Sequence, residues 1–215
     1  MGRVFLGGGK VGMKKTFTSR LPSGYTELAY IKSSGTQRID TGVKANQNIR
    51  VVMDMQGAPE TAVSDIGMYF GASDSNESVK LMFGDASGSG WFNVAYYNTQ
   101  SYGNSQETQA NYLTRKTIDF NKNTVTYGAE SNTFTAGTYS VNYPIFLFAL
   151  NRAGTTRYPA KMLLYSCQIY DNGTLIRDFV PCVSDADGIG LYDLVNNKFY
   201  GNAGTGSFTG SEVAA

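Results

Sequence analysis

The sequence predicts an all-β protein in which two antiparallel sheets pack into a sandwich. Short runs of β-branched and aromatic residues are separated, every eight to twelve residues, by Gly, Asn, Ser and Thr, which is typical of sandwiches and barrels. No stretch of twelve residues keeps a helical period. Between Ile49 and Met55 every second residue is apolar, whereas Arg50, Asp54 and Gln56 fall on the opposite face, as expected for a strand with one wet side.

The same patterns place the individual strands along the chain. We expect them at 49–55, 66–72, 79–83, 91–97, 116–120, 124–128, 144–150, 161–170 and 174–180. The run from Ile145 to Leu150 is apolar on both faces, so it is expected mid-sheet, with its outer side covered by a loop or another chain. The Gly-rich stretches at 87–90 and 201–210 predict tight turns, so residues 21–215 are expected to form one domain.

The dipeptide Asn172-Gly173 lies between two β-rich runs and is a strong signal for a two-residue hairpin. A regular hairpin would place Cys167 opposite Asp178, and Leu163 opposite Cys182. The two cysteines would then be separated by about 13 Å along the strands, at ~3.4 Å per residue. A disulfide needs Cα atoms within about 7 Å, so we expect two reduced, buried thiols unless this register is wrong.

Residues 1–20 differ from the rest of the chain in charge. They contain five cations and no acid, whereas the remainder carries a net charge of −4, within a total of +1. We expect a basic, Gly-rich N-terminal arm that docks on an acidic surface, with a solvated tail as the alternative. Phe5 and Phe17 are its only aromatic residues, so nucleic-acid binding is not expected.

Residues 7–12 read GGGKVG and satisfy the pattern G-x-G-x-x-G after the strand-like Arg3–Leu6. A dinucleotide site would also need a helix directly after the glycines, with its N-terminus at the pyrophosphate. Pro22 and Gly24 stop a helix there after about two turns. The segment is therefore interpreted as a connector, and Arg3–Leu6 as a candidate edge strand for a neighbouring protein's sheet.

The composition excludes several kinds of site. The chain has no histidine, which removes Ser-His and Cys-His nucleophile pairs and histidine-ligated metals. The longest apolar run has six residues, so we expect no membrane span, and the N-terminus lacks the apolar stretch of a signal peptide. We therefore expect synthesis in the cytoplasm.

Two long segments carry a family resemblance. YSCQIYDNGTLIRDFVPC at 165–182, with GIGLYDLVNNKFYGNAGTGSFTG at 188–210, resembles the C-terminal part of concanavalin A-like, laminin-G-like jelly-roll domains of bacteriophage structural and bacterial surface proteins. LPSGYTELAYIKSSGTQRIDTG at 21–42 resembles the start of these domains. The resemblance implies a concanavalin A-like jelly roll over residues 21–215, following an extended arm. It does not select one activity, because this superfamily includes glycan binders, protein binders and glycoside hydrolases.

Glycan binding needs an exposed aromatic face beside amide or charged groups. Two segments offer this combination: 90–104, and the loop 151–158, which contributes Arg157 as a further polar side chain. A core role for the aromatic residues and an ordinary solvated turn are the respective alternatives. The candidate glycan-binding residues are Trp91, Asn93, Tyr97, Tyr102, Asn104, Asn151 and Arg152.

Catalysis and metal binding find less support. The hydrolase branches of the superfamily carry E-x-D-x-x-E on one strand, which this chain lacks, so we expect no enzyme and no catalytic residue. Many laminin-G-like domains bind calcium at a sheet rim, and calcium needs six to eight oxygen ligands. No ligand motif is present, so no cofactor is expected. Asp185 and Asp187 remain the candidate calcium ligands.

Together these observations predict a non-enzymatic phage virion protein, made in the host cytoplasm and present in several copies as a capsid decoration or tail component. The jelly-roll body would contact host or mucosal glycans, and the arm would bind other virion proteins. The alternatives are a carbohydrate-binding module on a bacterial cell surface and a glycoside hydrolase. The anchoring residues of the arm are expected to be Arg3, Val4, Phe5, Leu6, Lys10, Lys14 and Lys15.

Overall fold

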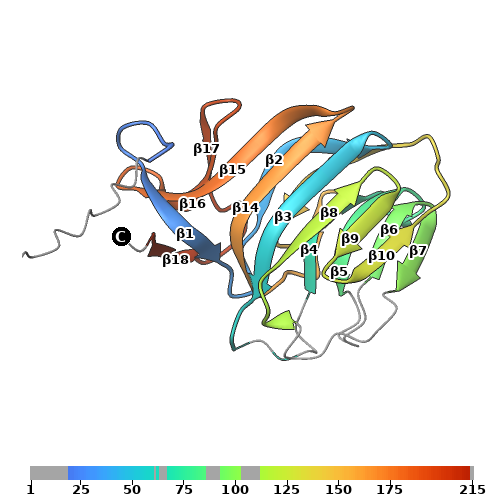
Figure 1. Cartoon of the computed structure of the whole chain (residues 1–215), viewed down its shortest axis with the longest axis horizontal. Coiled ribbons are helices and arrows are strands. Elements are labelled where there is room, and N and C mark those ends of the chain that lie inside the picture. The colour runs from blue at the N-terminus through green and yellow to red at the C-terminus, as the bar shows by residue number, and fades with distance from the viewer. Residues whose placement is uncertain (1–18, 61, 63–66, 86–92, 103–111, 214–215) are drawn as a thin grey trace, which may run out of the picture.

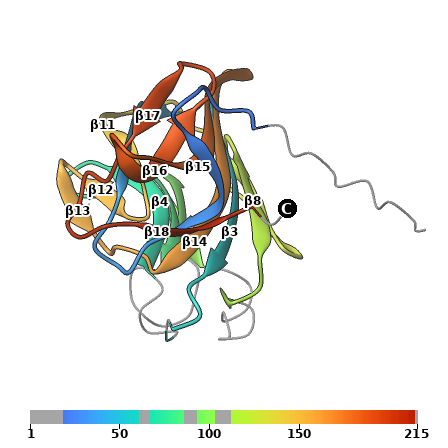
Figure 2. The ribbon, with the colours of Figure 1, turned by 90° about the vertical axis from the view of Figure 1, so that its left-hand side faces the viewer.

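The computed structural model describes residues 19–60, 62, 67–85, 93–102 and 112–213. Within these ranges the regular elements are all β-strands, and they form two sheets that face each other (Figures 1 and 2). The expected all-β, two-sheet sandwich is therefore confirmed. In the same ranges no helix has the length and apolar character needed to cross a bilayer. Residues 1–18, and with them the anchoring residues expected in the arm, lie outside the described ranges.

Sheet A contains ten strands in the order β10-β9-β8-β3-β14-β1-β15-β16-β17, with β18 also paired to β1. Its strands are β1 (Thr26–Lys32), β3 (Ile49–Gly57), β8 (Lys116–Asn121), β9 (Thr124–Tyr127), β10 (Glu130–Thr133), β14 (Met162–Asp171), β15 (Thr174–Ser184), β16 (Gly188–Asp193), β17 (Lys198–Tyr200) and β18 (Thr209–Glu212).

Sheet B contains eight strands, with β13-β12-β4-β5-β6-β7 in order and β11 paired to both β2 and β4. Its strands are β2 (Ile39–Asn46), β4 (Gly67–Ser73), β5 (Lys80–Asp85), β6 (Asn93–Tyr97), β7 (Thr99–Tyr102), β11 (Ser140–Leu147), β12 (Leu150–Arg152) and β13 (Thr155–Arg157). The β12–β4 pair is parallel, whereas the other strand pairs are antiparallel.

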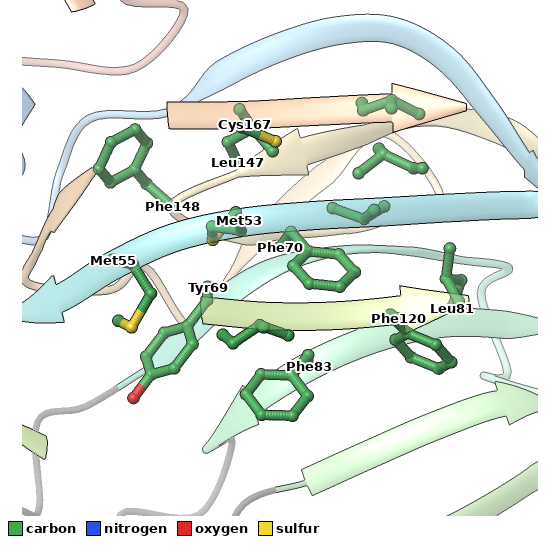
Figure 3. Close-up of a cluster of buried hydrophobic side chains, with 14 of the residues drawn as sticks. Met53, Met55, Tyr69, Phe70, Leu81, Phe83, Phe120, Leu147, Phe148 and Cys167 are labelled. Atoms are coloured by element: carbon green, nitrogen blue, oxygen red, sulfur yellow. The ribbon is translucent and has the colours of Figure 1, made fainter. Parts of the chain in front are cut away.

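The core lies between the two sheets and is rich in aromatic residues. The alternation expected in β3 is observed, because Ile49, Val51, Met53 and Met55 are buried while the residues between them are partly exposed. In Figure 3, Met53 and Met55 of β3 lie among aromatic side chains of β4, β5 and β8. Burying one such side chain contributes roughly 1.5–3 kcal/mol. These contacts therefore supply most of the driving force that holds the sheets together.

The expected strand at 144–150 is divided in the structure. Residues 145–150 are buried and lie mid-sheet, as predicted, but β11 ends at Leu147 and β12 begins at Leu150. Between them Phe148 has φ = +68°, a left-handed conformation that is strained for a bulky residue. Three contacts hold it there. Its N–H donates to Tyr69 O at 2.7 Å, its carbonyl accepts from Ala160 N at 2.8 Å, and its ring packs on Phe208 at 5.0 Å.

The β14–β15 hairpin corrects the expected register. The turn is as predicted, with positive φ at Asn172 and Gly173. A bulge then shifts the pairing by one residue, so that Cys167 lies opposite Phe179 and Asp178 lies opposite Gln168. The bulge adds one unpaired residue to β15, which a sequence count of a regular hairpin cannot include.

Further from the turn, β14 and β15 are no longer direct neighbours, which overturns the expected pairing of Leu163 with Cys182. Strand β1 lies between the two strands (Figure 1). Leu163 instead faces Lys32 of β1, and Cys182 faces Glu27 of β1. The conclusion about the thiols nevertheless holds, because both cysteines are free and buried.

We predict that neither thiol reacts with an aromatic disulfide reagent at mildly alkaline pH while the protein is folded. Burial raises the pKa of both thiols, that of Cys182 to about 12, so the reactive thiolate is scarce and inaccessible. In denaturant two thiols should titrate, and one in a Cys182→Ala variant. Rapid labelling of the folded protein, or no titratable thiol in denaturant, would contradict the structure.

Candidate functional site

A shallow pocket with a volume of about 330 Å³ lies beside the hairpin formed by β12 and β13. Its lining consists of Ser75, Arg152, Ala153, Thr155 and Arg157, and we refer to it as the hairpin pocket. Ser75 belongs to the loop 74–79 between β4 and β5, so the pocket joins segments far apart in sequence. In Figure 2 the strands β12 and β13 lie on the side of the molecule away from β3 and β8.

The hairpin turn is fixed by the side chain of Asn151. Its Nδ2 donates to Pro144 O at 2.9 Å, and its Oδ1 accepts from Gly154 N at 2.8 Å. Positive φ angles at Ala153 and Gly154, of 49° and 85°, give the tight turn that a two-residue hairpin requires. Asn151, a candidate sugar ligand, is only 2% exposed, so its amide holds the turn rather than facing solvent.

Arg152 joins the hairpin to the loop 74–79. Its Nε donates to Ser75 O at 3.0 Å, and its Nη1 lies 3.3 Å from Glu77 Oε1. The backbone repeats this link, because Ala153 N donates to Ser73 O at 3.0 Å. The guanidinium of Arg152 is therefore held in place and still lines the pocket.

Arg157 lines the pocket, and Tyr158, the next residue in the chain, lies outside the lining. The side chain of Arg157 is exposed and has no hydrogen-bond or ion-pair partner among the described residues. Tyr158 is 38% exposed. Among the described residues, Tyr158 and Val195 are the large hydrophobic residues that are exposed. The φ of +48° at Tyr158 is maintained by a 2.7 Å hydrogen bond from Met68 N to Tyr158 O. Strained backbone of this kind is frequent at binding sites.

The other candidate glycan patch is only partly described. Trp91 and Asn104 lie outside the described ranges. Asn93 and Tyr102 are neighbours across β6 and β7, although their side chains are not described. Tyr97 is half-buried, and its ring stacks on Tyr139 with 5.7 Å between centroids.

The solvent face of sheet A also combines aromatic and charged groups, but they satisfy one another. Arg50 forms a two-point ion pair with Asp119 at 2.7 and 2.8 Å, and this contact raises the pKa of the arginine. Arg115 pairs with Asp54 in the same way, at 2.6 and 2.9 Å, and its guanidinium lies 3.7 Å from the ring centre of Tyr165. The arginine therefore covers the ring face that a sugar would need.

The acidic loop at 184–188 is tied to the start of the domain. Asp187 Oδ2 accepts hydrogen bonds from Tyr25 Oη at 2.6 Å and Ser184 Oγ at 3.2 Å. The first bond is the main reason why the pKa of Tyr25 rises to about 12. Asp185 is exposed beside it. Among the described residues, no three His, Cys, Asp or Glu side chains are grouped so that they could hold a metal ion.

Sequence reasoning found only part of the hairpin pocket. Arg152 and Arg157 could be identified from the sequence because they flank a polar, Gly-containing turn. Ser75 could not be found, because the parallel pairing of β12 with β4 is what brings its loop to the hairpin. Tyr158 is exposed and has a left-handed backbone, and the sequence gives no signal for either feature.

We predict that calcium leaves the melting temperature of the protein unchanged. Asp187 Oδ2 is already occupied by two hydroxyl donors, and a calcium site would need several more oxygens than this loop supplies. Thermal unfolding in a calcium chelator and in millimolar calcium should coincide, with magnesium as the control ion. A rise of several degrees with calcium alone, lost in an Asp187→Asn variant, would show a calcium site.

Comparison with known proteins shows a remote structural likeness. No protein-family model matches the sequence, and no curated protein sequence matches it. Among solved structures, the chain is similar to a mutant of the NanB sialidase of Streptococcus pneumoniae, with 16% identity and a TM-score of 0.42. The similarity covers 70% of this chain and 27% of the sialidase chain.

Proposed function

We propose that the protein is a non-enzymatic carbohydrate-binding β-sandwich and that the hairpin pocket holds the sugar. The observation that carries the proposal is the position of Arg157 and Tyr158. Arg157, whose side chain has no partner among the described residues, lines the pocket, and the exposed Tyr158 follows it directly in the chain. An aromatic surface beside a few fixed polar groups is the usual composition of a sugar site.

The chemistry of the pocket suits a small part of a glycan. The C–H face of a sugar ring can pack on Tyr158, while its hydroxyl groups accept from the guanidinium groups of Arg152 and Arg157. The hydroxyls of Ser75 and Thr155 can donate or accept. The volume lies at the lower end of the range of about 300–1,000 Å³ for ligand sites, so a single pocket is expected to bind weakly.

Support for a non-enzymatic role comes from the state of the acidic side chains. Asp54, Asp119 and Asp193 are engaged with arginines, and Asp187 accepts from two hydroxyls. A glycosidase needs two carboxyl groups about 5–9.5 Å apart across the scissile bond. The lining of the hairpin pocket contains no carboxylate.

We further propose display on a bacteriophage particle in several copies, because the sequence resembles phage structural domains and begins with a basic arm. Several weak sites on one particle would gain affinity through simultaneous binding. Mass spectrometry of purified particles should detect the protein. Its absence there, together with its recovery from bacterial surface fractions, would favour the alternative of a cell-surface carbohydrate-binding module.

The glycan proposal predicts binding that depends on Tyr158. A glycan array should identify ligands, and NMR titration with the best one should show a loss of about fivefold or more in a Tyr158→Ala variant, since a lost aromatic contact costs about 1 kcal/mol. Val195→Ala is the matched control, because Val195 is also exposed, at 41%, and lies outside the pocket. The melting temperatures of both variants should stay close to that of the parent.

Failure to bind any glycan on the array would overturn the proposal. Release of reducing ends from a polysaccharide, abolished by one carboxylate-to-amide change, would show a hydrolase instead.

A further inference from the structure

Resting on the proposed function, we propose that the hairpin pocket selects anionic sugars, whose carboxylate or sulfate group binds Arg157. The lining contains two guanidinium groups and no acid. The carboxylate of Glu77 lies 3.3 Å from Nη1 of Arg152. Glu77 therefore balances the charge of Arg152, whereas the charge of Arg157 has no counter-ion among the described residues, so the pocket carries a net positive charge.

The strand register places three polar side chains on the same face of the hairpin. Thr155 lies directly opposite Arg152 in the β12–β13 ladder. Arg157 follows two residues after Thr155, and residues two apart on a strand share a face. Leu150, directly opposite Arg157, lies on this same face and is fully buried with Met68, Met82 and Ala95. The cationic face is therefore presented on a fixed support.

The bond from Met68 N to Tyr158 O fixes the chain directly after Arg157, just as the amide of Asn151 fixes the turn before it. Both ends of β13 are thereby held in place. The backbone that carries Arg157 needs little ordering when a ligand binds, which lowers the entropic cost of binding.

An anion gains more from Arg157 than a neutral hydroxyl does. A free guanidinium is solvated by water, and a sugar hydroxyl replaces that water with a bond of similar strength. A carboxylate or sulfate can accept two parallel charge-assisted bonds from the guanidinium fork. Elsewhere in this chain Arg50 and Arg115 bind Asp119 and Asp54 in this two-point manner. Arg157 has no such carboxylate among the described residues.

The test compares sugars that differ in one acidic group. NMR titrations use methyl β-glucuronide against methyl β-glucoside, and galactose 3-sulfate against galactose, with sodium sulfate as the anion alone. We expect at least one acidic sugar to bind about tenfold more tightly than its neutral counterpart, because charge-assisted hydrogen bonds are roughly twice as strong as neutral ones. This preference should decrease at high salt.

Variants locate the effect at Arg157. Arg157→Ala should remove the preference for the acidic sugar while leaving the melting temperature unchanged, because the side chain is exposed and has no partner among the described residues. Arg157→Lys should retain only part of it, since an ammonium group lacks the planar fork. Lys44→Ala removes the same charge from an exposed position that does not line the pocket, and should have no effect.

The possible failures are distinguishable. Equal binding of charged and neutral sugars, or a preference that survives Arg157→Ala, overturns the anionic selectivity and leaves glycan binding intact. Sodium sulfate binding as tightly as the acidic sugars also overturns it, because the sugar would then contribute nothing. The absence of binding to every sugar, on the array as well, overturns the proposed function itself.

Discussion

Strand β1 pairs with β15 through its first residues and with β14 through its last, and so satisfies backbone groups that these two strands would leave unpaired where they diverge. The bulge in β15 is the only irregularity in the paired part of the hairpin before the strands separate. Because β1 fills this position, sheet A continues from β10 to β17 without an internal edge. Ile31 of β1 is fully buried, so the same strand also contributes to the core.

The position of β1 brings the two ends of the domain together. The loop after β1 contains Gln37, whose buried side chain accepts from Ser34 N at 2.9 Å and donates to Ser207 O at 3.0 Å. Arg38 N donates to Asn202 Oδ1 at 3.1 Å in the same region. The C-terminal segment that follows pairs with β1 as β18. The Gln37–Ser207 and Arg38–Asn202 bonds are partly buried and connect residues more than 160 positions apart, so the early and late segments that carry the family resemblance form one structural unit.

The sequence was most informative where side-chain alternation is decided locally. The two faces of β3, the Asn172-Gly173 turn and the burial of both cysteines were all predicted correctly. The predicted register beyond the turn was wrong, because no local pattern records the bulge in β15 or the insertion of β1 between the two strands.

The same distinction holds at the candidate site. Polar residues around a Gly-containing turn could be identified, so Arg152 and Arg157 were found. The sequence could not show which polar residues of this turn would face solvent, since Asn151 and Arg157 are both polar. Asn151 is buried and bonded to Pro144 O and Gly154 N, whereas Arg157 is exposed. That outcome depends on the pairing of β12 with β4, which is set by the whole of sheet B.

The left-handed backbone at Phe148 has a consequence for solubility during folding. The run Ile145–Leu150 is uncharged, contains no proline and has high β-propensity, which is the composition of segments that stack into amyloid. The kink divides it into the end of β11 and the start of β12, so the native chain never presents six consecutive residues of this run as one extended strand. A partly unfolded molecule that keeps the Phe148–Phe208 contact would therefore offer a shorter template for intermolecular pairing than its sequence implies.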